Sequence, residues 1–350
     1  MQLRQSFYAL SKTELKSFLI KNNQSGFLAS KLFQFHYNND RLHHISSRTW
    51  DVLKAHFDFF LPTIAKTDKS DDGTYKFLIE FYDGKQVEAV LIPFFKRYTI
   101  CLSSQVGCAM KCSFCYTGTQ GLTRHLKAHE IVGQYMAVKN FLMQEISCES
   151  LIPNIVFMGQ GEPLHNFDEL KKSLEILLDA EGLALGPRQI TVSTAGFIPG
   201  LLRYNELPKV NLALSLHSTF EEVRSQLIPI NNQYPLRDVI AVIDSINLSK
   251  RQFVTYEYLL IDGLNDRTED VEGLSQLLSS RKAIINIIAF NPFPQSQYRR
   301  PSPISVDQFK ERLVEKSLRV MIRTTKGSDI LAACGQLKIE SEAAQRQNKY

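Results

Sequence analysis

The 350-residue sequence predicts an α/β protein in which a partial (β/α) barrel follows a small helical N-terminal domain and a β-hairpin extension. The main observation is that short apolar runs alternate with helical segments from residue 98 onward. Strands that are apolar on both faces and separated by helices are typical of a parallel sheet covered by helices. Six or seven such units favour a partial or full barrel over an open sheet.

Seven apolar runs are the predicted strands of this barrel. They are residues 98–103, 154–159, 189–194, 210–216, 253–261, 285–291 and 318–324. The predicted helices between them include residues 128–145, 168–180, 236–249 and 306–315. We assign the barrel to residues 98–338 and expect the polar tail, residues 339–350, to fray.

The first 70 residues are predicted to form the helical domain. Ser11 and Glu14, in the sequence SKTE, have the spacing of a capping box ahead of an apolar run, which marks the start of a first helix. A second helix is predicted for residues 27–36 and a third for residues 48–60, before a proline.

The hairpin extension is predicted for residues 71–97. Two β-rich runs in the sequence TYKFLIEFYDGKQVEAVLIP are joined by Asp83 and Gly84. An Asp-Gly pair between two such runs is a strong signal for a hairpin turn, because glycine readily adopts the positive φ angle that the turn requires.

Positive charge is concentrated at the N-terminus. The whole chain has a formal net charge of +5, and residues 1–67 alone hold nine Lys and Arg against four Asp and Glu. A basic module of this kind is typical of proteins that bind a polyanion such as RNA. An ordinary solvated surface gives the same count, so charge alone leaves both interpretations open.

Membrane insertion and secretion are not expected. The longest apolar runs, such as the eight residues 283–290, are short of the ~20 residues that a membrane span needs. The N-terminal sequence MQLRQSFYALSKTELK has no apolar core followed by a small-residue cleavage site. We therefore expect a cytoplasmic protein that has no membrane partner.

Four of the six cysteines lie within fifteen residues, in the sequence CLSSQVGCAMKCSFC. Such clustering does not suit a disulfide framework, and a reducing compartment favours a metal-binding or catalytic use. Cys108, Cys112 and Cys115 form C-x3-C-x2-C just after the first predicted barrel strand. Three thiolates suit an iron–sulfur cluster or zinc.

The two metals imply different roles for the triplet. A 4Fe-4S cube normally takes four thiolates, so three would leave one iron open for chemistry. Zinc, with Cys101 or a histidine as a fourth ligand, would form a closed site that supports a loop. The spacing favours the iron–sulfur interpretation, since C-x3-C-x2-C is uncommon in zinc modules.

Several polar and glycine residues fall at the ends of predicted strands, as the cysteine loop does. They are Gly159 to Pro163 (GQGEP), Ser193, Ser215 to His217 and Asn291. Reacting groups of (β/α) barrels sit at the C-terminal ends of the strands, so these residues are expected to meet at one site. Each alone is weak evidence, because a lone Gly-x-Gly is often a turn and an isolated histidine is often structural.

At the level of the whole motif set, the chain resembles a known family. The cysteine triplet with Phe114 before its last member resembles the signature of the radical S-adenosylmethionine (radical SAM) enzymes. The wider sequence resembles the RlmN and Cfr group of RNA adenosine methyltransferases over about residues 70–338, and more loosely over the N-terminal module. The matching motifs are CLSSQVGC, FMGQGEPLHNF, STAG, LALSLHS, PIN, NPFP and GSDILAACGQL.

The resemblance implies a radical-SAM core and a set of cofactor ligands. Cys108, Cys112 and Cys115 would bind a 4Fe-4S cluster, and two molecules of S-adenosylmethionine would be used in each turnover. Gly161 and Glu162 would bind the methionine amino group. The rest of the cofactor would be lined by Ser193, Ser215, Leu216, His217 and Asn291.

The resemblance also implies catalytic residues. A ring carbon of adenine is a poor nucleophile, so direct methyl displacement would fail there and a radical is needed. Cys334 would accept a methyl group, lose a hydrogen atom to a radical and add to the adenine. Cys101 would then attack the sulfur of Cys334 and release the methylated RNA through a transient disulfide. Glu88 would accept a proton from the adduct, although a solvent-facing carboxylate is the alternative on a hairpin strand.

The expected substrate is an unpaired or flipped adenosine, because the reacting atom is blocked inside a stacked helix. Methylation at carbon 2 of an adenosine in the peptidyl-transferase centre of 23S rRNA is expected, with the tRNA adenosine next to the anticodon as a further target. Gln160 and the sequence YTGTQG depart from the RlmN pattern, which leaves Cfr-like methylation at carbon 8 as the alternative.

The expected partners are RNA and an electron donor such as flavodoxin, and the protein is expected to be a monomer. The basic N-terminal module is the candidate for RNA binding, and four residues near the cluster could contact phosphate: Lys111, Arg124, His125 and Lys127.

Two other functions fit part of the sequence. A zinc-stabilised RNA-binding protein would leave Cys334 without a role, and a radical enzyme acting on a small molecule would not need it.

Overall fold

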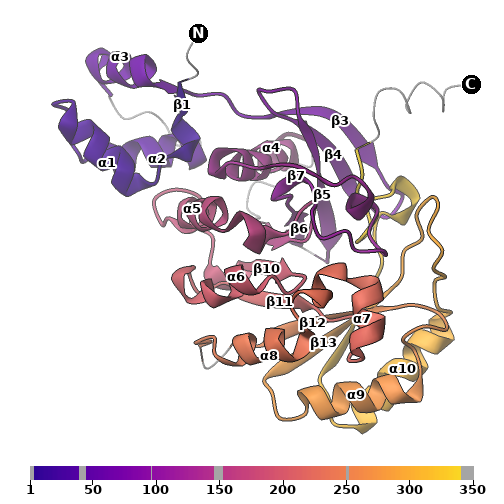
Figure 1. Cartoon of the computed structure of the whole chain (residues 1–350). Coiled ribbons are helices and arrows are strands. Elements are labelled where there is room, and N and C mark those ends of the chain that lie inside the picture. The colour runs from indigo at the N-terminus through magenta and orange to yellow at the C-terminus, as the bar shows by residue number, and fades with distance from the viewer. Residues whose placement is uncertain (1–3, 39–44, 96, 146–152, 250–251, 340–350) are drawn as a thin grey trace, which may run out of the picture.

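A computed structural model describes residues 4–38, 45–95, 97–145, 153–249 and 252–339, and a ten-stranded sheet runs through these ranges (Figure 1). The order of the strands is β14-β13-β12-β11-β10-β9-β6-β5-β4-β3. Their bounds are β3 Thr63–Lys69, β4 Tyr75–Glu80, β5 Gln86–Phe94, β6 Arg97–Cys101, β9 Asn154–Phe157, β10 Ile190–Thr194, β11 Asn211–Ser215, β12 Val254–Leu260, β13 Ala283–Ala289 and β14 Val320–Arg323.

The sheet is parallel from β6 through β9 to β14, and antiparallel from β6 to β3. All seven predicted barrel strands are confirmed, each with bounds within a few residues of the prediction. Strands β14 and β3 are the two edges and do not pair with each other, so the barrel is partial, as predicted. Two smaller sheets pair β1 (Gln5–Ser6) with β2 (Phe57–Asp58) and β7 (Gln105–Gly107) with β8 (Leu122–His125).

Helices follow the parallel strands and cover the outer face of the sheet (Figure 1). The bounds of the helices in the described ranges are α1 Lys12–Lys21, α2 Leu28–Asn38, α3 Ser47–His56, α4 Ala128–Glu145, α5 Phe167–Leu178, α6 Ile198–Leu202, α7 Glu221–Leu227, α8 Leu236–Asp244, α9 Thr268–Leu278 and α10 Pro303–Glu315. The four barrel helices named from the sequence are confirmed, although α8 ends five residues earlier than predicted. None of these helices combines the length and the apolar character that a membrane span requires.

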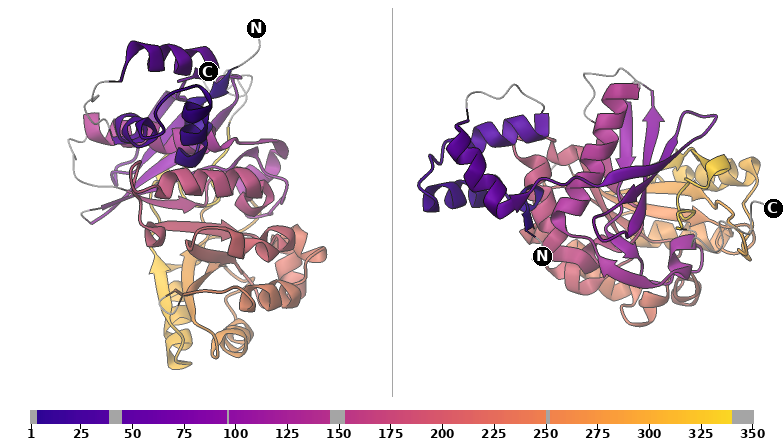
Figure 2. Two further views of the ribbon diagram at one scale, coloured as in Figure 1. Left: turned by 90° about the vertical axis from the view of Figure 1, so that its left-hand side faces the viewer. Right: turned by 90° about the horizontal axis from the view of Figure 1, so that it is seen from above.

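The N-terminal helices contain the predicted capping box. The Ser11 Oγ atom accepts a hydrogen bond from the Glu14 amide at 3.2 Å, and a Glu14 carboxylate oxygen accepts one from the Ser11 amide at 2.7 Å. Lys12 pairs with Asp179 at 3.2 Å, which ties α1 to the end of α5. In Figure 2, seen from above, these helices lie at one end of the molecule and the C-terminal elements lie at the other.

The predicted extension of the third helix to residue 60 is wrong. Helix α3 ends at His56, and Phe57 begins the short strand β2. Phe57 and Phe59 both contact the ring of Phe7, with ring centroids 6.5 Å and 5.0 Å away. Residues two apart point to the same side in a strand but to different sides in a helix. The aromatic contacts therefore favour the extended conformation.

Strand β3 was not predicted, and it lies within the range assigned to the helical domain. Its sequence TIAKTDK is mostly polar and most of its side chains are exposed, so it lacks the apolar alternation that marks a strand. It is the edge of the sheet, where charged side chains discourage pairing with another chain. The predicted hairpin is confirmed as β4 and β5, with Gly84 in its turn at a φ of +74°. The division of the chain into domains stays a prediction.

Candidate active site

The C-terminal ends of the parallel strands surround a pocket of about 150 Å³. Three of its lining residues are the predicted cluster ligands Cys108, Cys112 and Cys115. Six further lining residues were predicted from the sequence: Gly161, Glu162, Ser193, Ser215, His217 and Cys334. Segments spread over more than 220 residues therefore meet at this end of the barrel.

The cysteine loop runs between β7 and a 3-10 helix at Tyr116–Thr119. The Cys108 amide donates to the Gly121 carbonyl at 2.9 Å, and the Cys115 amide donates to the Cys112 carbonyl at 3.1 Å. These bonds fold the loop back so that all three thiols face the pocket. Burial raises the pKa of the Cys108 thiol to about 12 and also raises the pKa values of the other two thiols. A metal must therefore displace their protons on binding.

The donor set fits a 4Fe-4S cube better than a zinc ion. Within the described residues, no three His, Cys, Asp or Glu side chains are close enough to share one metal ion. A cube binds each thiolate at a separate corner, so its ligands do not need to converge on one point. Cys101, the proposed fourth zinc ligand, lines a different pocket. The three thiols would hold the cube and leave one iron facing the rest of the pocket.

The two glycines of GQGEP are required by close packing within the protein. A Cβ atom at Gly161, whose φ is +101°, would lie 2.6 Å from the Cβ of Gln105. A Cβ atom at Gly159 would lie 2.7 Å from the Leu102 carbonyl oxygen. The Gln105 side chain also accepts a hydrogen bond from the Glu162 amide at 2.9 Å. The chain between β6 and β7 thus fixes the position of Glu162.

Glu162 is a buried carboxylate held by backbone donors. Its oxygens accept hydrogen bonds from the amides of Leu164 at 3.1 Å and Ala195 at 2.8 Å. Burial raises the pKa of Glu162 to about 7. Glu162 lines the same pocket as the cluster thiols, where a ligand ammonium group would stabilise its charged form.

His217 is a neutral hydrogen-bond donor in this pocket. Its Nδ1 atom accepts a hydrogen bond from the Leu259 amide at 3.1 Å, which places the ring proton on Nε2. Burial lowers the pKa of His217 to about 3, so the ring carries no charge near neutral pH. Its neighbour Leu216 differs from the prediction, because its fully buried side chain packs in the hydrophobic core and does not line the pocket.

Glu257 and Met158 line the pocket but were not predicted from the sequence. Glu257 lies on β12, and its carboxylate accepts a hydrogen bond from Asn286 at 2.7 Å. Burial raises the pKa of Glu257. The sequence signal that could have identified it is a glutamate inside the apolar run FVTYEYLLI. A strand covered on both faces is buried, and charged residues are rarely buried without a partner or a ligand.

A second and smaller pocket, of about 40 Å³, shares Met158, Ile288 and Cys334 with the first. Cys101 and Asn291 line this second pocket, so the structure brings together the two cysteines that are 233 residues apart in the sequence. Asn291 does not line the first pocket. Its side-chain Nδ2 atom instead donates a hydrogen bond to the Cys334 carbonyl at 3.2 Å. Burial raises the pKa of the Cys101 thiol to about 12.

The segment that carries Cys334, residues 334–339, is hydrogen-bonded to residues 116–120, which directly follow the cysteine loop. The Tyr116 amide donates to the Gly335 carbonyl at 2.6 Å, and the Thr117 hydroxyl donates to the Leu337 carbonyl at 2.6 Å. The Gln120 side chain donates to the carbonyl of Ile339 at 3.0 Å. These bonds place Cys334 beside the cluster ligands.

Glu88 is buried, so the solvent-facing alternative is wrong. Its carboxylate contacts the Lys76 ammonium at 3.1 Å and accepts a hydrogen bond from the Lys338 amide at 2.8 Å. Burial raises the pKa of Glu88, while the Lys76 charge opposes this shift. Glu88 lines neither pocket, but Lys338 follows directly on Leu337, which lines the second one.

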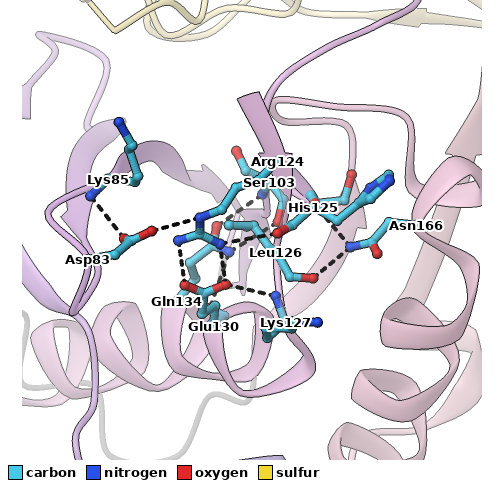
Figure 3. A network of polar contacts seen from close by, with 11 residues as sticks. Asp83, Lys85, Ser103, Arg124, His125, Leu126, Lys127, Glu130, Gln134 and Asn166 are labelled. Atoms are coloured by element: carbon cyan, nitrogen blue, oxygen red, sulfur yellow. Dashed lines mark hydrogen bonds and ion pairs between the residues drawn. The ribbon is translucent and has the colours of Figure 1, made fainter. Parts of the chain in front are cut away.

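Arg124 has intramolecular partners on both sides and is a poor candidate for phosphate contact. Figure 3 shows its guanidinium between two carboxylates, with Asp83 at 2.8 Å and Glu130 at 2.7 Å. These contacts join the turn of the β4–β5 hairpin to the start of α4. Lys111 and Lys127 are both exposed, and the Lys127 ammonium pairs with Glu169 at 3.1 Å. The phosphate contact expected of them stays a prediction.

The fold and the three clustered thiols at its strand ends define a radical SAM enzyme. Residues 102–275 match the Radical SAM superfamily. The chain is 41% identical over 345 residues to the dual-specificity RNA methyltransferase RlmN of Pelobacter propionicus, covering 96% of both. It is 37% identical over 355 residues to the RlmN of Granulibacter bethesdensis, covering 98% of this chain and 89% of that one. The chain therefore belongs to the RlmN family.

A solved structure agrees with this assignment. The crystal structure of a radical SAM methyltransferase from Sphaerobacter thermophilus is 35% identical in sequence to this chain and has a TM-score of 0.88. The match covers 96% of this chain and 100% of the other. The N-terminal helices and the barrel are thus both part of the shared architecture.

The Gly161→Ala variant is expected to bind S-adenosylmethionine at least about tenfold more weakly. The added Cβ atom would push the chain away from Gln105 and displace Glu162, in addition to the strain of a positive φ angle. Equilibrium dialysis of the reconstituted protein measures the affinity. Gly263→Ala is the control, since its φ is also positive at +70° but no atom lies within 4 Å of the new Cβ. Equal affinity of Gly161→Ala and wild type would contradict this account.

Binding of S-adenosylmethionine is expected to weaken as the pH falls below about 7. Glu162, with its pKa raised to about 7, loses its charge over this range, and its attraction for the ligand ammonium group is lost with it. The affinity should fall by up to about tenfold per pH unit. In Glu162→Gln the affinity should be low and independent of pH from 6 to 8. A wild-type affinity that is constant over this range would exclude a titrating role for Glu162.

Proposed function

We propose that this protein methylates carbon 2 of an adenosine in RNA, with 23S rRNA at the peptidyl-transferase centre as one target and tRNA next to the anticodon as another. The observation that carries the proposal is the position of Cys334. It lines one pocket together with the three cluster thiols and a second pocket together with Cys101. A residue so placed can exchange a group between a cofactor on one side and a substrate on the other.

When bound, the cluster and S-adenosylmethionine would supply a radical strong enough to remove a hydrogen atom from a methyl group. Cys334 first takes that methyl group from one S-adenosylmethionine, so two molecules are used in each turnover. After hydrogen removal, the carbon on Cys334 forms a bond to the adenine ring. Glu162, Ser193, Ser215 and His217 orient the cofactor, with His217 as an uncharged donor.

Release of the product requires two further residues of this chain. Glu88 takes the proton from the ring carbon of the adduct. The unpaired electron left by radical addition would return to the cluster. The sulfur of Cys101 then forms an S–S bond with Cys334 as the bond between the Cys334 sulfur and the methylene carbon breaks. The electron pair of that bond and the proton of the Cys101 thiol go to the methylene carbon, which becomes the new methyl group. Asn291 supports this step by holding the Cys334 carbonyl at 3.2 Å.

Support for carbon 2 comes from the RlmN relatives, and the Cfr-like alternative is methylation at carbon 8. Gln160, which departs from the family pattern, does not line the cofactor pocket. Its side chain accepts a hydrogen bond from the Glu88 amide at 3.0 Å and donates to Gln120 at 3.2 Å. The glutamine at position 160 therefore helps to position Glu88 and, through Gln120, the segment that carries Cys334. Since both act on the adenine ring in the proposed reaction, the methylated carbon needs a direct test.

The remaining parts of the proposal concern partners. The basic N-terminal module would bind the RNA backbone, and the exposed side chains of Arg48 and Lys54 on α3 are available for this. A flavodoxin-type protein would reduce the cluster. We expect the enzyme to act in the cytoplasm as a monomer.

Mass spectrometry of rRNA and tRNA from cells with and without the protein tests the reaction and its targets together. We expect 2-methyladenosine in both RNAs, lost when the protein is absent. Finding 8-methyladenosine instead would overturn the carbon 2 assignment. A methylated small molecule and unchanged RNA would overturn RNA as the substrate.

The Cys101→Ala variant is expected to retain a covalent RNA adduct on Cys334, because the attacking thiol is missing. Intact mass and nuclease digestion of protein isolated from cells would detect the bound nucleotides. Cys334→Ala should carry no adduct and give no product. The control is Cys148→Ala, which changes the one cysteine outside the triplet and the matching motifs and should leave turnover at the wild-type level. RNA-free Cys101→Ala protein with normal turnover would refute the role of Cys101.

A further inference from the structure

Glu88 forms a buried ion pair with Lys76 on the strands of the hairpin extension, and Lys76 has no role in the reaction described so far. The Lys76 ammonium is 3.1 Å from one carboxylate oxygen of Glu88, and the side chains are only 14% and 7% exposed. The two residues lie on neighbouring strands, where Lys76 is in register with Val90 and Glu88 is in register with Leu78. They are therefore diagonal partners across the β4–β5 ladder.

Glu88 is held rigidly in addition to this ion pair. Its second carboxylate oxygen accepts the Lys338 amide at 2.8 Å. Its backbone amide donates to the Gln160 side chain at 3.0 Å, and its carbonyl accepts the Ser103 hydroxyl at 2.7 Å. Contacts from the hairpin, the barrel and the C-terminal segment thus fix both the main chain and the carboxylate.

Stability does not account for such a pair. Two charges removed from water cost more than a similar apolar pair, and replacing buried ion pairs with apolar residues often leaves stability unchanged or increases it. A further charge near Glu88 is Asp68 on β3, which is in register with Lys76 but pairs with Lys66 at 2.8 Å. The ammonium group of Lys338, whose amide binds Glu88, lies over the ring of Tyr116 at 4.1 Å from its centroid. Lys76 therefore provides the positive charge that pairs with the Glu88 carboxylate.

We propose that Lys76 is a positioning residue that keeps Glu88 ionised at neutral pH, so that Glu88 is ready to accept a proton. This inference rests on the proposed function and on the role of Glu88 in it. In that step the C–H bond of the ring carbon in the adduct breaks, an O–H bond forms on Glu88, and the electron pair of the broken bond stays in the ring. Lys76 keeps its own protons throughout.

The sign of the effect follows from electrostatics. Burial already raises the pKa of Glu88, and the nearby ammonium opposes that rise. An opposite charge at this distance changes a carboxylate pKa by about 1–3 units. Without Lys76, the pKa of Glu88 rises further and the ionised fraction at neutral pH falls. Proton removal then becomes the slow step, and the covalent adduct accumulates.

The experiment measures the rate at which the covalent RNA adduct on Cys334 releases methylated RNA. It uses the reconstituted enzyme and an RNA substrate in a single turnover, between pH 6 and pH 9. We expect Lys76→Met to form methylated Cys334 and the RNA adduct normally but to resolve the adduct at least about tenfold more slowly at pH 7. The pH dependence of its release rate should shift to higher pH by about 1–3 units. Lys76→Arg, which keeps the positive charge, should restore the wild-type profile.

The matched control is Lys171→Met on α5. It removes an exposed ion pair with Glu206 and should leave the pH profile unchanged. A Lys76→Met profile identical to wild type would overturn the inference. If Lys76→Met does not fold, Lys76→Gln replaces it in the same comparison, and a wild-type profile for that variant would be equally decisive. Failure of the proposed function gives a different result, because wild-type enzyme would then form neither adduct nor methylated RNA.

Discussion

The hydrogen bonds between residues 116–120, which follow the cysteine loop, and residues 334–339 are the contacts on which the active site depends. The Tyr116 amide and the Thr117 hydroxyl hold the carbonyls of Gly335 and Leu337, and Cys334 is thereby placed beside the cluster ligands. Neither segment forms a regular strand or long helix of its own. Their mutual bonding brings two motifs that are far apart in the sequence into one site at the C-terminal ends of the strands.

Burial gives the site its electrostatic character. The same low-dielectric environment raises the pKa values of the cluster thiols and of Glu162, and it lowers that of His217. In the absence of ligands most of these groups are neutral or close to neutral. A cationic cofactor group and a metal cluster restore the missing charges, so ligand binding and ionisation of the site are coupled.

The barrel could be predicted from the sequence because doubly covered parallel strands are continuous apolar runs, and all seven were recognised. Strand β3 could not, since an exposed edge carries no such pattern. Among site residues, the cysteine triplet and GQGEP were recognisable as local motifs. The burial of Glu88 and the true position of Asn291 depend on the distant residues Lys76 and Cys334, and no local pattern encodes such contacts.

The unequal exposure of Cys101 and Cys334 has a consequence for regeneration of the enzyme. Cys101 is only 5% exposed, whereas Cys334 is partly accessible, so an external reductant would reach the Cys334 sulfur first after the proposed disulfide forms. Cys101 would then be the leaving group, and a thiol of high pKa departs slowly. Recovery of the free thiols would therefore make each cycle dependent on the supply of cellular reductant.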